Sequence, residues 1–228
     1  TLDWGVGESG ILLEDATNTT VGGIGAGQGN TIAYSGKIDP QYGAGVAVQD
    51  SGTGNTIRGN SIYSNALNGI DLSAGTVIDG PTPNDSGDVD SGANNLQNWA
   101  VLTSVSIADD GTFSFELDTS TLQNRAYHVD FYASTDRDGG QVEGARYLGT
   151  WSGITDGTPE IGTLTGITLN PGEYITSVTT DVLNAESSEF SNYAVATDSD
   201  AGGATPNLQA VTTGVGGLSI NHDGGNDT

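Results

Sequence analysis

The residues with the clearest chemical potential lie in one acidic run between residues 79 and 98. Asp85, Asp88 and Asp90 place three carboxylates within six residues on a turn that contains glycine, and Asn94 follows them. Calcium takes about six to eight oxygen ligands, and an acidic segment without apolar residues gains order by binding it. The spacing lacks the glycine and the glutamate of an EF-hand loop. We therefore predict a Ca²⁺ site at these four residues, with an acidic linker without metal as the alternative.

Two other acidic turns are further candidates for a metal. Asp136 and Asp138 stand in an Asp-Arg-Asp-Gly-Gly turn with Glu143 shortly after it, and Asp198 and Asp200 flank a serine further along the chain. Both turns contain residue types that form ordinary loops. A plain acidic loop is therefore the preferred interpretation of both, with Asp136 and Asp138 kept as the second metal candidate.

A short sequence repeat occupies residues 1–78, before the acidic run. Each copy has a glycine or asparagine before a short apolar strand, and the copies begin at residues 10, 30, 45, 55, 60 and 69. The Gly-Val pair at 45–46 recurs as Gly-Ile at 69–70, a spacing of 24 residues that is typical of solenoids. These strands are too short to be stable alone. They predict a short right-handed parallel β-helix, with ordinary β-hairpins as the alternative.

Residues 99–197 have a different pattern of apolar and polar residues. Seven segments with alternating apolar and polar residues predict strands, at residues 101–107, 112–117, 127–134, 145–151, 161–169, 174–182 and 190–197. Their spacing and turn residues favour an Ig-like antiparallel β-sandwich. The apolar residues expected in its core alternate along two of the strands: Phe113, Phe115, Leu117, Val129, Phe131 and Ala133. The whole chain is thus predicted to be all-β, with residues 79–98 as the linker between two domains.

Residues 198–228 are predicted to be a flexible joint followed by a tail strand. The tail contains a strand-like Gly-Leu-Ser-Ile segment, Gly217, Leu218, Ser219 and Ile220, with no obvious partner in the sequence. An open end of a parallel β-helix exposes unpaired backbone groups. We therefore expect the tail strand to cover such an end, within the chain or in a neighbouring copy.

The charge balance excludes several classes of partner. Five basic residues against 29 acidic ones give a formal net charge of −24, so we expect no binding to nucleic acid or to an anionic membrane surface. No apolar stretch approaches the roughly 18 residues of a membrane-spanning helix, so we expect no membrane insertion. The absence of cysteine excludes a disulfide scaffold. The sequence begins within a repeat, and we expect it to be part of a longer exported chain.

Several motifs together resemble a family of large bacterial and archaeal surface proteins. In this sequence they are GNTI, GN and GIDL, then PNDSGDVDSGANNLQN, then DFYAS, EGARYLG and TDVLNAESSEFS. This order is similar to that of proteins in which a right-handed parallel β-helix is closed by an Ig-like sandwich, and the match covers about residues 10–197. The tail GGLSINHDGGNDT is similar to the lead-in of a laminin-G-like domain. The resemblance implies this architecture and a modular exported protein, and it also favours Ca²⁺ in the acidic run.

Catalysis receives little support. Polysaccharide lyases with a parallel β-helix need an Arg or Lys beside an acidic Ca²⁺ site, and hydrolases of that fold need a cluster of Asp. Residues 1–78 contain two bases, Lys37 and Arg58, and no histidine. We expect Arg58 to form an exposed ion pair with an aspartate such as Asp50, and His128 to be a half-buried structural residue. No serine-histidine-aspartate grouping, phosphate loop or zinc motif is present. We therefore predict a chain that is not an enzyme.

These observations predict a structural or assembly module of an extracellular or cell-surface protein, either a filament subunit or an adhesin stalk. Copies would associate head to tail by strand donation. One alternative is a carbohydrate-binding module of a secreted protein, for which Tyr42, Tyr63 and Trp151 are the available aromatic residues. A polysaccharide lyase or hydrolase is a less favoured alternative. Three Asn-x-Ser/Thr sequons are candidate glycosylation sites: Asn18, Asn84 and Asn226.

Overall fold

The computed structural model of the chain describes residues 8–36, 39–137, 142–170 and 172–199. These residues form an all-β protein with several sheets, as predicted, and their only helical segments are the 3₁₀ turns η1 (Pro40–Tyr42) and η2 (Ala93–Leu96). Several predicted residues lie outside the described part of the chain: Lys37, Asp138, Asp200, Gly217, Leu218, Ser219, Ile220 and Asn226.

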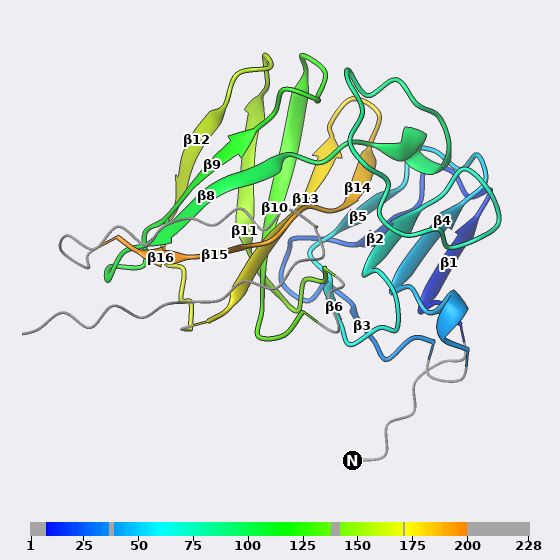
Figure 1. The fold of residues 1–228 in the computed structure, drawn as a ribbon, viewed down its shortest axis with the longest axis horizontal. Helices are drawn as coiled ribbons and strands as arrows, with labels where there is room; N and C mark the ends of the chain where they lie inside the picture. Colours follow the sequence, from blue (N-terminus) through cyan, green and yellow to red (C-terminus); the bar gives the residue numbers. More distant parts are fainter. Residues whose placement is uncertain (1–7, 37–38, 138–141, 171, 200–228) are drawn as a thin grey trace, which may run out of the picture.

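The first part of the chain winds into parallel sheets, and we call residues 8–73 the coil (Figure 1). Its strands are β1 (Ile11–Glu14), β2 (Thr20–Gly22), β3 (Thr31–Ala33), β4 (Val46–Gln49), β5 (Thr56–Arg58), β6 (Ser61–Tyr63) and β7 (Ile70–Leu72). They pair in parallel as β1-β4-β7, β2-β5 and β3-β6. The registers Ile11↔Val46↔Ile70 and Ile32↔Ile62 join the copies that begin at residues 10, 45 and 69 and those that begin at residues 30 and 60. The copy that begins at residue 55 does not pair with the copy at residue 30, because β5 pairs with β2 instead.

Small and polar residues hold the successive turns of the coil together. Glycine precedes three of the apolar pairs because a Cβ would not fit there: it would lie 2.7 Å from the Ile32 side chain at Gly10, 2.5 Å from the Gly69 carbonyl oxygen at Gly45, and 2.6 Å from a Phe190 ring carbon at Gly69. Side-chain amides bridge one turn to the next: Asn60 Oδ1 accepts hydrogen bonds from both the backbone N–H and the amide of Asn30 at 3.0 Å. Asn65 Oδ1 likewise accepts the N–H of Ser35. Apolar side chains fill the interior of the coil.

The second part of the chain forms two further sheets from nine strands. These are β8 (Val101–Ile107), β9 (Phe113–Asp118), β10 (Ala126–Ser134), β11 (Arg146–Ile154), β12 (Glu160–Leu164), β13 (Tyr174–Asp181), β14 (Glu186–Phe190), β15 (Ala194–Val195) and β16 (Thr197–Asp198). One sheet has the order β12-β9-β8-β16, and the other has the order β11-β10-β13-β14 with β15 also paired to β13. Six of the seven predicted strands coincide with β8 to β13. The seventh, predicted over residues 190–197, was wrong.

In place of the predicted seventh strand the chain forms β14 and two very short strands, and the apolar pattern of the sequence does not predict β14. Its residues Glu-Ser-Ser-Glu-Phe are almost all polar, yet all five are buried. They are buried because β14 lies between β13 and the coil, where its polar side chains bond to coil backbone groups. The chain then forms the two-residue strands β15 and β16 instead of one long strand.

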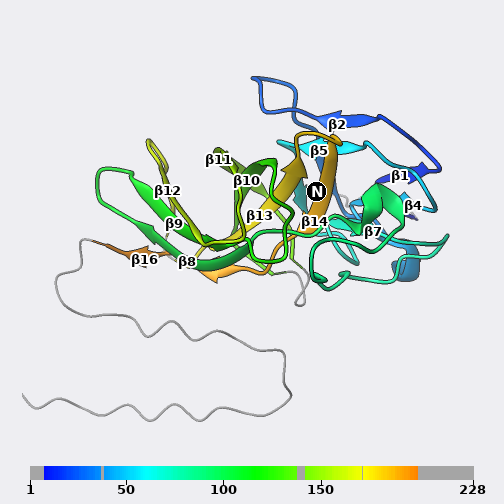
Figure 2. The same cartoon turned by 90° about the horizontal axis from the view of Figure 1, so that it is seen from above.

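The five-stranded sheet lies between the four-stranded sheet and the coil (Figures 1 and 2). One of its faces packs on the four-stranded sheet around aromatic residues that include Phe113, Phe115 and Phe131. Its other face contributes Tyr132, Val178 and Phe190 to the apolar interior of the coil. We call this second contact, between the coil and the five-stranded sheet, the joint.

Candidate functional site

The acidic loop brings three carboxylates together as the sequence suggested. Asp85, Asp88 and Asp90 each offer an oxygen atom, and these atoms all lie within 4.8 Å of one another. All three residues are half-buried. Such a group of oxygens suits a hard cation, although exposed acidic groups of this kind also occur without one.

Hydrogen bonds to the following segment hold this loop in shape. The backbone N–H of Asn98 donates to Asp88 Oδ1 at 2.7 Å, and Gln97 Nε2 donates to Asp88 Oδ2 at 2.9 Å. The Asn98 amide donates to the backbone carbonyl of Asp85 at 2.8 Å, while Val89 N–H donates to the Asp85 carboxylate. Two of these neighbours, Gln97 and Asn98, are buried, and they hold the Asp85 and Asp88 segments in place.

The electrostatics of the loop favour a bound cation. Burial, followed by the nearby carboxylates of Asp90 and Asp85, raises the pKa of Asp88 to about 6. Burial and Asp85 also raise the pKa of Asp90, and Asp90 Oδ1 is buried without a hydrogen-bond partner among the described residues. A hard divalent cation bound here would relieve the repulsion and give that oxygen a partner.

Asn94, predicted as a fourth ligand, has a different role. Its side chain is fully buried and continues the amide ladder of the coil: Asn94 Oδ1 accepts the N–H of Asn55, and its amide donates to the carbonyls of Asn55 and Ser187. These bonds tie the linker to the coil and to β14. We therefore remove Asn94 from the proposed ligand set.

The other predicted sites remain scattered. Asp136 is exposed, and its Oδ1 accepts the N–H of Arg137, whose guanidinium stacks on the ring of Tyr193. Asp198 lies in β16. Of the glycosylation candidates, Asn18 is exposed, whereas the Asn84 amide donates to the carbonyl of Trp99 and to Thr121 and would have to break both bonds to accept a sugar.

Arg58 forms a buried ion pair across the joint, so the predicted exposed pair with Asp50 was wrong. Its guanidinium donates to both carboxylate oxygens of Asp130 at 2.7 and 2.8 Å, and the Asp130 side chain is fully buried. Thr150 also donates to Asp130. The sequence could not reveal this pair, because its two members are 72 residues apart and belong to different parts of the fold.

The joint also provides hydrogen-bond partners for backbone N–H groups of the coil. In a longer parallel β-helix, the next turn would bond to these groups. The N–H of Ile62 donates to the carbonyl of Gly144, and the N–H of Ile57 donates to Ser187 Oγ, both at 2.9 Å. The hydroxyl of Tyr132 accepts the N–H of Gly59 at 2.8 Å. The five-stranded sheet therefore caps this end of the coil.

The joint contains two buried acids, Asp71 and Glu189, that form no ion pair with a basic side chain in the described part of the chain. Glu189 accepts the N–H groups of Leu72 and Thr82 at 3.0 and 2.7 Å, and Asp71 Oδ1 accepts the N–H of Gly80 at 3.0 Å. Burial, with a further contribution from Asp79, raises the pKa of Asp71 to about 7. Burial and the charges of Asp71 and Asp79 raise the pKa of Glu189 well above its usual range. Asp71 Oδ2 is buried and has no hydrogen-bond partner among the described residues.

His128 contacts a serine on the neighbouring strand, a contact that the sequence does not reveal. His128 Nδ1 lies 2.7 Å from Ser152 Oγ on the neighbouring strand. The nearby Asp130 carboxylate is occupied by Arg58 and Thr150, and neither His128 nor Ser152 lines any cavity described below.

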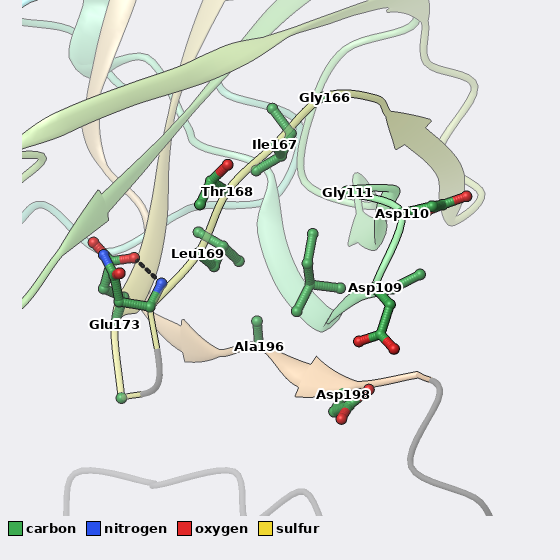
Figure 3. Close-up of a pocket in the computed structure, with 14 residues that line it drawn as sticks. Asp109, Asp110, Gly111, Gly166, Ile167, Thr168, Leu169, Glu173, Ala196 and Asp198 are labelled. Carbon is green, nitrogen blue, oxygen red and sulfur yellow. Dashed lines mark hydrogen bonds between the residues drawn. The ribbon is translucent and has the colours of Figure 1, made fainter.

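A hollow opens at one end of the two packed sheets (Figure 3). It has a volume of about 710 Å³, with an apolar floor that includes Ile107, Ile167 and Leu169 and an acidic rim that includes Asp109 and Asp198. No basic or histidine side chain from the described residues lines it. A smaller hollow of about 230 Å³ lies on the outer face of the coil beside Tyr42.

The three aromatic residues considered for sugar binding do not form one platform. Tyr42 lines the smaller hollow, Tyr63 packs edge-on against Tyr34, and Trp151 packs against Phe115.

Comparison with known proteins gives no family to which the chain can be assigned. No protein-family model matches the sequence, and no curated protein matches it. Within the described residues, no helix has the length and apolar character needed to cross a membrane.

Proposed function

We propose that this chain is a rigid, non-catalytic structural module of an extracellular or cell-surface protein, such as a filament subunit or an adhesin stalk. Its architecture would be a short right-handed parallel β-helix closed by an Ig-like β-sandwich. The joint carries this proposal. Because the sandwich satisfies backbone groups of the coil and buries Arg58 against Asp130, the two parts resist bending as one body.

Calcium would stiffen the linker between the two parts. We propose Asp85, Asp88 and Asp90 as its protein ligands, with water completing the shell. The cation would neutralise the repelling carboxylates and fix the loop that runs from the end of the coil to β8. Its role would thus be structural.

Thermal unfolding with Ca²⁺ and with a chelator tests this metal. With Ca²⁺ at 100 times its dissociation constant, binding to the native state adds about 2.7 kcal/mol, which corresponds to a rise in Tm of about 5–10 °C. We expect Asp88→Asn to lose this rise and Asp136→Asn, in the other acidic turn, to keep it. A wild-type Tm that does not respond to Ca²⁺ would remove the metal from the proposal.

Assembly of copies would use the opposite end of the coil. β1, β2 and β3 each pair on one side only within the described residues, so one edge of each is open. Leu12 and Ile24 are exposed on this part of the coil. We propose that the tail strand, Gly217–Ile220, of one copy adds to such an edge of the next copy. Repetition of this contact gives a head-to-tail filament.

Negative-stain microscopy and sedimentation of the full chain test the assembly. We expect filaments that fray when calcium is chelated, and we expect Leu218→Asp to reduce the chain to single particles because it places a charge in the donated strand. Thr213→Asp, in the same tail but outside that strand, is the matched control. A wild-type chain that sediments as a monomer at all concentrations would contradict the assembly but leave the rigid module intact.

A further inference from the structure

The smaller hollow lies on the outer face of the sheet β1-β4-β7 and has the chemistry of a ligand site. It has a volume of about 230 Å³ and is bounded by the strands, by Tyr42 of η1 and by Thr76 and Ile78 of the segment that follows β7. This volume is smaller than the roughly 300–1,000 Å³ that drug-sized ligands occupy. It suits a single ring.

Gln49 provides the observation that points to a ligand. It lies at the end of β4, lines the hollow and is only 7% exposed. The backbone pairs Gln49 with Glu14 of β1, but its side-chain amide makes no hydrogen bond to any residue in the described part of the chain. The amide faces an open hollow, so the hydroxyl groups of a ligand bound there would replace water as its hydrogen-bond partners.

The other walls show what kind of molecule could supply those bonds. Tyr42 and Leu12 are 41% and 48% exposed and give the hollow an apolar wall, while Glu8 and Glu14 add carboxylates that accept hydrogen bonds. The matching ligand has an apolar face and an edge of hydroxyl groups. A sugar ring has both: its C–H face packs on an aromatic ring, and its hydroxyls donate to carboxylates and accept from an amide.

Charge narrows the class of sugar. Among the described residues, the lining contains two glutamates and no basic side chain, and the whole chain has a formal net charge of −24. An acidic sugar such as a uronate would therefore be repelled. We propose that this hollow binds one ring of a neutral polysaccharide, with Tyr42 as the stacking residue and Gln49 as the hydrogen-bonding residue. The site does not depend on the proposed structural role, because a stalk and an isolated module would present it equally.

Binding of the full chain to neutral and acidic polysaccharides tests the site. The neutral probes are a β-glucan, an α-glucan, a mannan and a galactan, and the acidic probe is polygalacturonate, all followed by affinity electrophoresis and calorimetry. We expect binding to at least one neutral probe and none to polygalacturonate. Absence of binding to all four neutral probes, or equal binding to polygalacturonate, would overturn the proposal.

Three variants then locate the binding. Tyr42→Ala removes the stacking ring and Gln49→Glu replaces the amide donor by a carboxylate of the same shape, so each should weaken binding at least tenfold. Tyr63→Ala removes a tyrosine from another sheet of the coil and should leave binding unchanged. Unaltered Tm values establish that the variants are folded. Binding that survives in both Tyr42→Ala and Gln49→Glu would show that the sugar binds elsewhere and would overturn the site.

Discussion

The two faces of β10 show two ways of burying a strand. On one face, Tyr127, Val129, Phe131 and Ala133 enter an apolar core shared with the four-stranded sheet. On the joint face, Asp130 and Tyr132 contact the coil through a buried ion pair and a hydroxyl bond. The same nine residues thus contribute to a core that depends on apolar area and to an interface that depends on matched polar groups.

This difference predicts different responses to substitution. Loss of an apolar side chain costs the free energy of the buried area and of the cavity that remains. Loss of one polar partner in the joint leaves the other buried and unsatisfied, whereas removal of both can cost little. Substitutions on the two faces of β10 therefore test the comparison directly.

The largest effect is expected in the apolar core. Phe131 is fully buried, and its ring centroid lies 4.5 Å from that of Phe115 and 5.4 Å from that of Phe113. Phe131→Ala should lower the free energy of unfolding by about 3–5 kcal/mol, measured by urea denaturation. Ile161→Ala is the control because Ile161 is 77% exposed, and it should change stability by less than about 0.5 kcal/mol. A loss below about 1 kcal/mol for Phe131→Ala would show that this core is not tightly packed.

The joint should respond to pairs of substitutions. Asp130→Ala should cost about 3 kcal/mol, because it leaves the Arg58 guanidinium buried without its carboxylate. The double variant Arg58→Met/Asp130→Leu should recover most of this loss, since no buried charge remains. Urea denaturation of the two single variants and the double variant gives the coupling energy. A double variant as unstable as Asp130→Ala alone would mean that the joint follows the same rule as the apolar core.

The comparison also explains which parts of the fold could be predicted from the sequence. Alternation marks β9 and the apolar face of β10, because one face of each strand enters an apolar core. The glycine and asparagine repeats mark the coil, because its corners need small residues and side-chain amides. Alternation fails for β14, where the buried residues on both faces are polar. The residues of β14 belong to the motif TDVLNAESSEFS, but this motif alone does not reveal that Ser187 and Glu189 bond to the coil.

Some of the candidate sites could be predicted from the sequence and others could not. The three aspartates of the loop could be grouped from the sequence because they are neighbours in the chain. Arg58 and Asp130 could not be paired, and neither could Asp71 and Glu189, which are 118 residues apart. Gln49 gave no signal, because a glutamine at the end of a short strand is ordinary until its burial is known.

The smallest predicted effect concerns Asp71, which has no basic partner among the described residues. Burial is the main reason why the pKa of Asp71 is raised from 3.8 to about 7. Between pH 3.8 and about pH 7, the Asp71 carboxyl is therefore protonated in the folded protein and ionised in the unfolded chain. The contribution of Asp71 to the free energy of unfolding therefore grows as pH falls below 7, and it is lost as pH rises toward 7. Between pH 8 and pH 6 the free energy of unfolding should increase by about 1 kcal/mol from this residue.

Asp71→Asn removes the titration of Asp71 together with its coupling to Glu189, whose pKa the Asp71 charge helps to raise, and separates both from the more distant titrating groups. Asp88, with a pKa raised to about 6, acts in the same direction, while His128, whose pKa is lowered by burial and by Arg58, acts in the opposite one. Both are unchanged in the variant, so the difference between wild type and Asp71→Asn at each pH removes them. Urea denaturation in the presence of a chelator should give a difference that changes by about 1 kcal/mol from pH 8 to pH 6. Parallel curves would mean that Asp71 stays ionised in the folded protein, and that the joint tolerates a buried charge without a basic partner.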